Sequence, residues 1–339
     1  MLTNFPFGVS SFGIPVYNLL GIGNVYFVKN KADSDYAKFI SERQTTYVDG
    51  SQAVYTHDAT STVVTTNGLK AAFDACVDSR NDYVIVVPST TTFYTDVLLK
   101  MTKKCVHFLC PAALTNMVGC TNAVRIQQIG SAVSILSVEN GGIEIAGFYL
   151  KNIDAYAHIQ VPTTATCVAD GGASAWGISI HHNYFVSRST TTTLPMLYCT
   201  GDGASYSRIE NNWFTEQVSS GAWTTGIVAV AGNACSTDIC NNYFSVGDSC
   251  TATYGIANLS VKSMCAYNTF SECGGSGAGV TGGTITHCLY LGATVAAVGN
   301  LCATATGHFA TGGTAGVSYA NNIDGTATSG TDHWNLPAA

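Results

Sequence analysis

The sequence predicts an all-β chain folded as a right-handed parallel β-helix, or solenoid, with an N-terminal capping helix and an extended N-terminal arm. Three observations lead to this prediction. A six-residue motif recurs about every 30 residues, one amphipathic helix pattern is followed only by strand patterns, and charged residues make up only 10% of the chain. Repeats of 20–50 residues are typical of solenoids, in which stacked turns bury a continuous core.

The first region, residues 1–28, is an apolar arm that contains no charged residue. Pro6, Pro15 and four glycines disfavour a helix here. An apolar segment that cannot form its own core must bury itself on another surface. We expect the arm to dock on another protein or on sister subunits; the alternative is that it folds back over the open end of its own domain. The predicted docking residues are Phe5, Phe7, Phe12, Ile14 and Val16.

The second region, residues 29–65, is polar and is predicted to be a linker or a small irregular subdomain. The third region, residues 66–339, is predicted to be the β-helix with a short C-terminal tail. Asn67 can cap a helix in which apolar residues recur with helical spacing, at Leu69, Ala72, Phe73 and Cys76. An apolar run at 83–87 then predicts a buried strand, and alternating patterns at 97–101 and 106–110 predict two more.

The repeated motif reads I-x-x-N-x-F, and the distances between successive Phe positions are 37, 29, 30 and 26 residues. Ile and Phe are five residues apart, so one straight strand would place them on opposite faces. Because both are apolar, a bend must separate them. Asn tolerates the left-handed backbone conformation, which predicts a strand, a one-residue Asn corner and a second strand. The copies begin at Ile143, Ile180, Ile209, Ile239 and Cys265.

Stacking of the turns would place equivalent residues about 4.8 Å apart. It predicts an inner column of phenylalanines and a column of asparagines that hydrogen-bond amide to amide. Arg208 and Asp238 occupy equivalent positions on neighbouring turns and are expected to pair. The predicted ladder residues are Asn183, Asn212, Asn242, Asn268, Phe148, Phe185, Phe214, Phe244 and Phe270.

Two features carry a resemblance to a known family: the Asn-corner repeat over residues 143–270, and the helix pattern at 68–76 before the strand at 84–88. On these features the chain resembles the pectate-lyase-like β-helix superfamily, particularly the β-helical virion proteins of tailed bacteriophages, of decoration or tail-spike type. In that superfamily a helix of this kind covers the N-terminal end of the solenoid. The opening residues 1–15 also resemble the start of phage virion proteins.

The resemblance implies a bacteriophage virion structural protein assembled in the host cytoplasm. Because the tail after Asn322 is short and polar, a capsid decoration protein is the preferred expectation. The alternative is a tail spike or receptor-binding protein that binds or depolymerises host surface polysaccharide. Such solenoids often associate as trimers, so we expect a homotrimer. Residues 1–28 are expected to bind a phage capsid or tail protein.

Glycan-cleaving proteins on this fold need clustered carboxylates on an outer face. The position two residues before the motif Asn is occupied by Glu144, His181 and Glu210 on successive copies. If these turns are consecutive, the two glutamates lie about 9.6 Å apart, close to the separation of about 6.5–9.5 Å used by inverting glycosidases. Three solvated side chains are the simpler interpretation. We therefore expect no enzyme activity and keep a depolymerase using these residues as the alternative.

The position after the motif Asn forms an aromatic column, Tyr184, Trp213 and Tyr243. Such a strip can stack on sugar rings, which would give a glycan-binding protein without cleavage. Packing of the column against a loop or a sister subunit is the other interpretation.

Several other functions are not expected. The formal net charge of the whole chain is −7, and the basic residues after Asp170 are Arg188, Arg208 and Lys262, which argues against nucleic acid as a partner. No apolar run approaches 18 residues, and the N-terminus lacks a signal-peptide pattern. The 13 cysteines contain no C-x-x-C pair and are expected to be reduced core residues. His181 and His182 would face opposite ways in a strand, so we expect no metal and no cofactor.

Overall fold

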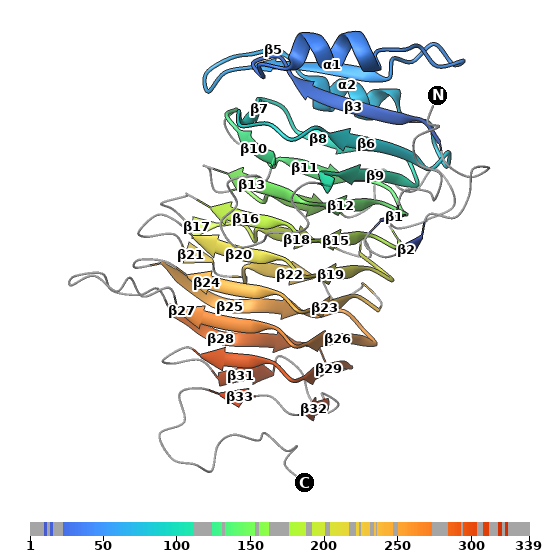
Figure 1. The fold of residues 1–339 in the computed structure, drawn as a ribbon. Coiled ribbons are helices and arrows are strands. Elements are labelled where there is room, and N and C mark those ends of the chain that lie inside the picture. The colour runs from blue at the N-terminus through green and yellow to red at the C-terminus, as the bar shows by residue number, and fades with distance from the viewer. Residues whose placement is uncertain are drawn as a thin grey trace.

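The computed structural model consists mostly of parallel strands in long stacked sheets, with two short helices at the N-terminal end (Figure 1). The structure describes residues 10–11, 14–15, 23–111, 124–130, 133–152, 156–162, 176–187, 192–200, 204–216, 222–223, 225–230, 234, 236–246, 250–272, 284–292, 294–303, 308–311, 318–320 and 323–324.

The largest sheet has 12 strands and includes the N-terminal part of the stack. Its strands are β3 (Val25–Asn30), β4 (Val54–Ala59), β5 (Val64–Thr66), β6 (Asp82–Val86), β9 (Val106–Leu109), β12 (Glu144–Ala146), β15 (Ser179–His181), β19 (Arg208–Glu210), β23 (Asp238–Cys240), β26 (Ser263–Ala266), β29 (Val295–Val298) and β32 (Ser318–Ala320).

Two further sheets run beside it. The 9-stranded sheet contains β7 (Phe93–Thr95), β10 (Val124–Gln128), β13 (Phe148–Asn152), β16 (Tyr184–Ser187), β20 (Trp213–Glu216), β24 (Tyr243–Val246), β27 (Thr269–Glu272), β30 (Leu301–Ala303) and β33 (Ile323–Asp324). The 10-stranded sheet contains β8 (Leu99–Met101), β11 (Leu136–Val138), β14 (Ile159–Val161), β17 (Thr192–Thr193), β18 (Leu197–Cys199), β21 (Ala222–Trp223), β22 (Val228–Val230), β25 (Thr251–Asn258), β28 (Thr284–Leu291) and β31 (His308–Thr311).

From β6 onward the chain visits the three sheets in a constant order, from the 12-stranded to the 9-stranded to the 10-stranded sheet. The short strands β17 and β21 are additions to this cycle. Each strand pairs in parallel with the equivalent strand of the next repeat, as β12, β15 and β19 do. The architecture is all-β and is compatible with a parallel β-helix, as the sequence predicts.

The predicted helix is confirmed as α2 (Gly68–Ala75). Asn67 caps it, because its side-chain oxygen accepts a hydrogen bond from the backbone N–H of Lys70 at 3.1 Å. Leu69 and Phe73 are buried and join the core, where the ring of Phe73 meets that of Phe108 edge to face. The helix therefore packs on the core at the N-terminal end of the stack (Figure 1).

Residues 29–65 contain the end of β3, the helix α1 (Tyr36–Arg43), β4 and all of β5 but its last residue, Thr66. The strand β3 pairs in parallel with β4 and with β6, so it belongs to the 12-stranded sheet. The predicted boundary between residues 28 and 29 thus falls inside a strand. The strands β4 and β5 pair antiparallel.

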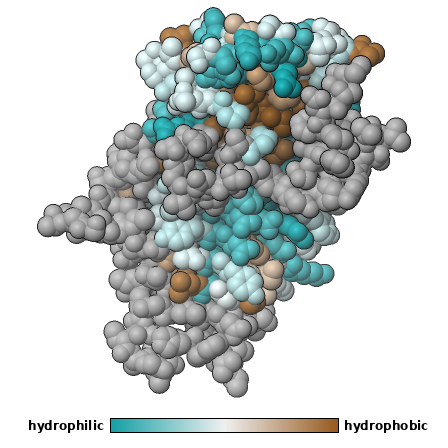
Figure 2. Space-filling view, viewed as in Figure 1, coloured by the Kyte–Doolittle hydropathy of each residue, from teal (hydrophilic) through white to brown (hydrophobic). Residues whose placement is uncertain are grey.

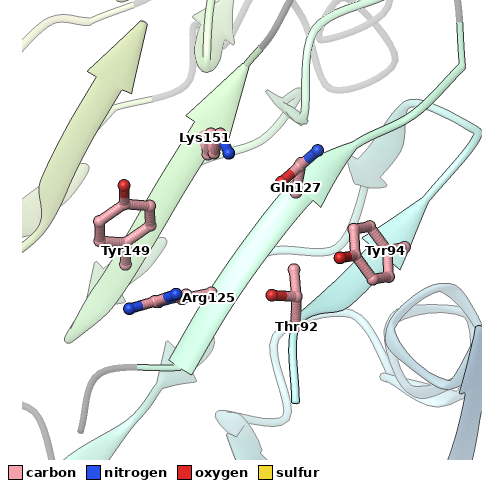
Figure 3. Close-up of a pocket in the computed structure, with 6 residues that line it drawn as sticks. All are labelled: Thr92, Tyr94, Arg125, Gln127, Tyr149 and Lys151. Atoms are coloured by element: carbon pink, nitrogen blue, oxygen red, sulfur yellow. The ribbon is translucent and has the colours of Figure 1, made fainter. Parts of the chain in front are cut away.

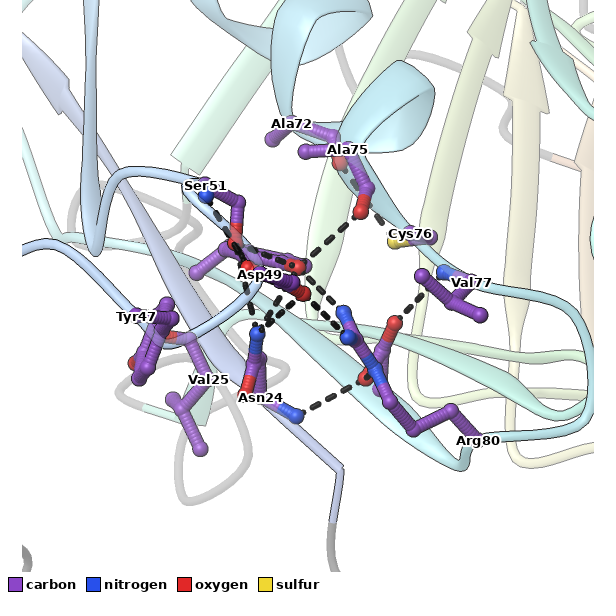
Figure 4. A network of polar contacts seen from close by, with 12 residues as sticks. Asn24, Val25, Tyr47, Asp49, Ser51, Ala72, Ala75, Cys76, Val77 and Arg80 are labelled. Atoms are coloured by element: carbon purple, nitrogen blue, oxygen red, sulfur yellow. Dashed lines mark hydrogen bonds and ion pairs between the residues drawn. The ribbon is translucent and has the colours of Figure 1, made fainter.

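A polar network fastens this N-terminal part to the first repeat (Figure 4). The guanidinium of Arg80 forms an ion pair with Asp82 at 2.6 Å and a second one with Asp49. Arg80 also donates to the hydroxyl of Tyr26, which in turn donates to the carbonyl of Ala75 at 2.9 Å. Since Asp82 is fully buried, its pairing with Arg80 satisfies a charge that would otherwise oppose folding.

The phenylalanine column lies in the core. The rings of Phe185, Phe214, Phe244 and Phe270 stack with centroid distances of 4.5, 4.9 and 4.8 Å. Phe148, the expected first member of the column, does not occupy that position, because the motif copies were aligned in the wrong register there. Strand pairing sets Ile145, and not Ile143, beside Ile180, so Leu150 lies beside Phe185 and Phe148 stacks on Phe108 at 4.1 Å.

The asparagine column is continuous and buried. Each side-chain amide donates to the side-chain oxygen of the next asparagine: Asn183 to Asn212, Asn212 to Asn242, Asn242 to Asn268, and Asn268 to Asn300, at 2.9–3.1 Å. The same oxygen accepts the backbone N–H of the preceding asparagine, as Asn242 does from Asn212 at 2.9 Å. Asn300 extends the column by one turn beyond the four predicted members.

The prediction that these asparagines form the left-handed corner is wrong. The positive φ angles, 53–57°, belong to the residue before each one, namely His182, Asn211, Asn241 and Tyr267. Gly147 and Gly299 occupy the same position in other turns, with φ of 87° and 63°. The residue with the positive φ forms the bend between the two strands. The buried asparagine that follows it forms the hydrogen bonds of the asparagine column.

Gly147 gives a direct test of this corner. A Cβ there would lie 2.2 Å from the carbonyl oxygen of Cys110, so Gly147→Ala is expected to lower the free energy of unfolding by about 2–3 kcal/mol. Gly177 also has a positive φ, 71°, but nothing lies within 4 Å of its Cβ position. Gly177→Ala therefore reports the backbone penalty alone, about 1 kcal/mol. Equal losses for the two variants in urea unfolding would contradict the close contact at Gly147.

A second, smaller apolar cluster lies apart from the main core, on β3, β6, β9 and β12. It consists of Val25, Tyr83, Leu109 and Ala146. Figure 2 shows apolar side chains gathered on one face of the molecule just below its N-terminal end.

The predicted docking residues Phe5, Phe7, Phe12 and Val16 lie outside the described residues. Ile14 is described only as part of β2 (Ile14–Pro15), which pairs antiparallel with β1 (Ser10–Ser11).

Cysteines serve mainly as buried thiols where the structure describes them. Burial raises the pKa of Cys76, Cys199 and Cys265 to about 12, so these thiols stay protonated. Cys288 is disulfide-bonded, so the expectation of reduced cysteines does not hold at that position.

Candidate functional site

A carboxylate held between two imidazoles lies on the 12-stranded sheet. One oxygen of Glu144 lies 2.6 Å from Nδ1 of His107, and the other lies 3.0 Å from Nε2 of His181. The second ring nitrogen of His107 contacts the side-chain oxygen of Asn81 at 2.7 Å, and Tyr83 stacks on the ring with a centroid distance of 4.4 Å. The side chain of Glu144 is only 12% exposed, so this cluster is closely packed.

The expected column of Glu144, His181 and Glu210 has a different register in the structure. Strand pairing aligns His181 with Ala146 and Glu210, whereas Glu144 aligns with Ser179. Glu144 reaches His181 diagonally across the strand pair, and Glu210 stands in the neighbouring row. The two glutamates therefore do not face each other across His181 as an acid and base in one column.

His107 is the member that sequence reasoning missed. The sequence does indicate that His107 points outward, because it lies between the apolar residues Val106 and Phe108 in a predicted strand. Its neighbour Glu144 is 37 residues away, and only the correct register brings the two together.

His181 and His182 also differ from the expectation that they face opposite ways. Their Nδ1 atoms lie 2.9 Å apart, because the left-handed backbone at His182 turns its ring toward its neighbour. Burial, and next the adjacent His181, lower the pKa of His182. In the described part of the chain, no group of three or more His, Cys, Asp or Glu side chains is arranged to hold a metal ion.

Replacing Glu144 with glutamine is expected to lower the free energy of unfolding by about 1–3 kcal/mol, because the amide cannot accept from both imidazoles. Chemical denaturation at pH 7 measures the loss. Glu42→Gln on the exposed helix α1 is the control and should change stability by less than about 0.5 kcal/mol. A Glu144→Gln protein as stable as the control would show that the two contacts carry no stability.

The aromatic column lies on the 9-stranded sheet and is longer than expected. Tyr149, Tyr184, Trp213 and Tyr243 are aligned by strand pairing. Their ring centroids are 5.2, 5.3 and 4.8 Å apart. The last three rings are half-buried and Tyr149 is buried. The column thus forms an ordered row of rings across four adjacent strands.

A groove adjoins this column at its N-terminal end (Figure 3). Its volume is about 170 Å³, and it is lined by outward side chains of the strands β7, β10 and β13 and the residue before β7: Thr92, Tyr94, Arg125, Gln127, Tyr149 and Lys151. The guanidinium carbon of Arg125 lies 5.3 Å from the centroid of the Tyr149 ring, a cation–π contact that orients the charge. Sequence reasoning missed this groove because the repeat is blurred between residues 110 and 180.

No known protein-family model, curated protein or solved structure matches the chain. Among the described residues, no helix is long and apolar enough to cross a membrane.

Proposed function

We propose that the chain is a right-handed parallel β-helix of pectate-lyase-like type that serves as a structural protein of a bacteriophage particle, as a capsid decoration protein. The observation that carries this proposal is the continuous buried column from Asn183 to Asn300, with the phenylalanine stack beside it. Stacked turns joined in this way make a rigid rod, which suits a structural role. The register that separates Glu144 from Glu210 favours a protein without glycosidase activity.

The proposal has two further parts. The part of the predicted arm that precedes β3, residues 1–24, attaches the rod to a capsid or tail protein, because an uncharged apolar arm needs a partner surface. Residues 25–28 belong to β3, which pairs with β4 and β6 in the 12-stranded sheet. Three copies associate as a homotrimer through an outer face. Mass photometry of the purified protein at micromolar concentration is expected to give three times the monomer mass of 35.4 kDa. A monomer would count against the trimer.

The particle role is tested by mass spectrometry of gradient-purified virions from a phage that encodes this chain. We expect its peptides in the particle fraction at a fixed ratio to the major capsid protein across independent preparations. Peptides found only in the soluble fraction of the lysate would overturn the proposal.

A tail-spike or receptor-binding role is the second candidate, and the aromatic row of Tyr184, Trp213 and Tyr243 favours it. Rings in a row can stack on successive sugars of a host surface glycan. Binding to host polysaccharide that is lost in Trp213→Ala, with no release of reducing ends, would establish recognition without cleavage. Release of reducing ends that depends on Glu144, His181 or Glu210 would instead establish a depolymerase.

A further inference from the structure

We propose that the groove on the 9-stranded sheet binds an acidic sugar residue of a glycan, whose anionic group contacts Arg125 and Lys151. This inference does not depend on the particle role, because it rests on the groove itself.

Charge is the first argument. Of the six described side chains that line the groove, two are cationic, Arg125 and Lys151, and none is acidic. The chain as a whole has a formal net charge of −7, so two cations among six described lining side chains stand out from the general charge of the molecule. Electrostatic complementarity therefore favours an anionic ligand over a neutral one.

The geometry is the second argument. Arg125 is exposed and Lys151 is half-buried. They come from the adjacent paired strands β10 and β13, where Gln127 lies directly beside Lys151 and Arg125 beside Tyr149. The ring of Tyr149 lies against the guanidinium, which reduces the side-chain freedom that binding would otherwise have to remove. A guanidinium held this way can grip a carboxylate or sulfate through two hydrogen bonds.

The remaining lining groups fit a sugar. Tyr94, Gln127 and Thr92 offer hydroxyl and amide groups, which can hydrogen-bond to ring hydroxyls. The groove also opens onto the aromatic row, since Arg125, Tyr149, Tyr184, Trp213 and Tyr243 follow one another in register. This row spans about 19 Å by strand spacing. A chain of sugars can thus follow the row while its acidic residue lies in the groove.

Isothermal titration calorimetry with the full chain tests the proposal. The probes are tetragalacturonate, whose charges are carboxylates, a sulfated galactan tetrasaccharide, and neutral galactotetraose. We expect at least one charged probe to bind and the neutral one to bind at least tenfold more weakly. Affinity for the charged probe should fall as NaCl rises from 50 to 500 mM, because salt screens the contacts. The charged probe that binds more tightly identifies the acidic group.

The decisive variants are Arg125→Gln and Lys151→Gln, each expected to weaken binding of the charged probe at least tenfold. The matched control is Arg208→Gln, which removes the same charge from an exposed side chain on the 12-stranded sheet and should leave affinity unchanged. Because all three positions lie on outer faces, the thermal unfolding midpoints of the three variants should agree with that of the parent protein. No binding by either charged probe, equal binding of the neutral probe, or equal losses in the control would overturn the proposal.

Discussion

Replacing Asn242 with alanine is expected to lower the free energy of unfolding by about 3–5 kcal/mol. The two N–H groups of the Asn242 side chain are shared among three acceptors: the carbonyl of Ile209 at 2.9 Å, the carbonyl of Cys240 at 3.0 Å and the side-chain oxygen of Asn268 at 3.1 Å. Its side-chain oxygen accepts two hydrogen bonds from Asn212. All of these groups are buried, and each one left unpaired costs about 1–3 kcal/mol.

Equilibrium unfolding in urea measures this loss. The matched control is Asn241→Gly, one residue earlier, where the side chain is exposed and the backbone has a φ of 56° that glycine adopts readily. We expect the control to change stability by less than about 0.5 kcal/mol. If Asn242→Ala and Asn241→Gly had the same small effect, the asparagine column would not be a source of stability.

Acidification from pH 6.5 to pH 4 is expected to destabilise the protein through two buried histidines, His57 and His158. Burial lowers the pKa of each to about 4, from an ordinary value of 6.5. Between these values the unfolded chain binds a proton that the folded chain does not. Stability therefore rises with pH in this window and is lost as pH falls, by about 3 kcal/mol for each histidine.

The test is the unfolding free energy measured from pH 8 to pH 4 in the parent protein and in His57→Leu. The variant should lose about 3 kcal/mol of the pH dependence between pH 6.5 and 4, whatever its stability at pH 8. Because the readout is a slope, a general destabilisation by the substitution does not disturb it. A variant curve parallel to the parent curve would show that His57 is not held neutral in the folded protein.

Much of the fold was predictable because the repeat encodes its own register. Between Ile180 and Phe270 the spacing of Ile, Asn and Phe aligns the strands correctly, and Arg208 lies beside Asp238 as expected. The ion pair expected between them is absent from the described residues, and a carboxylate oxygen of Asp238 instead accepts the backbone N–H of Met264 at 3.0 Å. The helix after Asn67 was equally clear from its cap and its apolar spacing.

The predicted register of the first motif copy was wrong because two residues fit the same motif position. Ile143 and Ile145 both match the first residue of the motif, and Phe148 matches its last residue when the motif begins at Ile143. The choice depends on Gly147, whose left-handed φ of 87° sets the corner. Once the corner moves, Glu144 shifts by two residues and meets His107 and His181. The pattern of apolar and polar residues does not show this two-residue shift of Glu144, because the shift depends on which residue adopts the left-handed backbone angle.

The structure of the N-terminal part and the groove could not be predicted from the sequence, for a different reason. Strand β3 is held by pairing with β4 and β6 and by the contacts of Arg80, all between segments with no repeat to align them. The groove combines residues of three turns, from Thr92 to Lys151, in the stretch where the motif is weakest. Such sites depend on register across turns, which only the folded chain supplies.

Cryo-electron microscopy of intact particles that carry this chain decides whether it is a capsid decoration protein. We expect rods that stand on the capsid shell with three-fold symmetry, each built of parallel strands and attached at its N-terminal end. Density for the chain at the tail tip would contradict the decoration role and favour glycan recognition. Absence of the chain from the particle would contradict the structural role altogether.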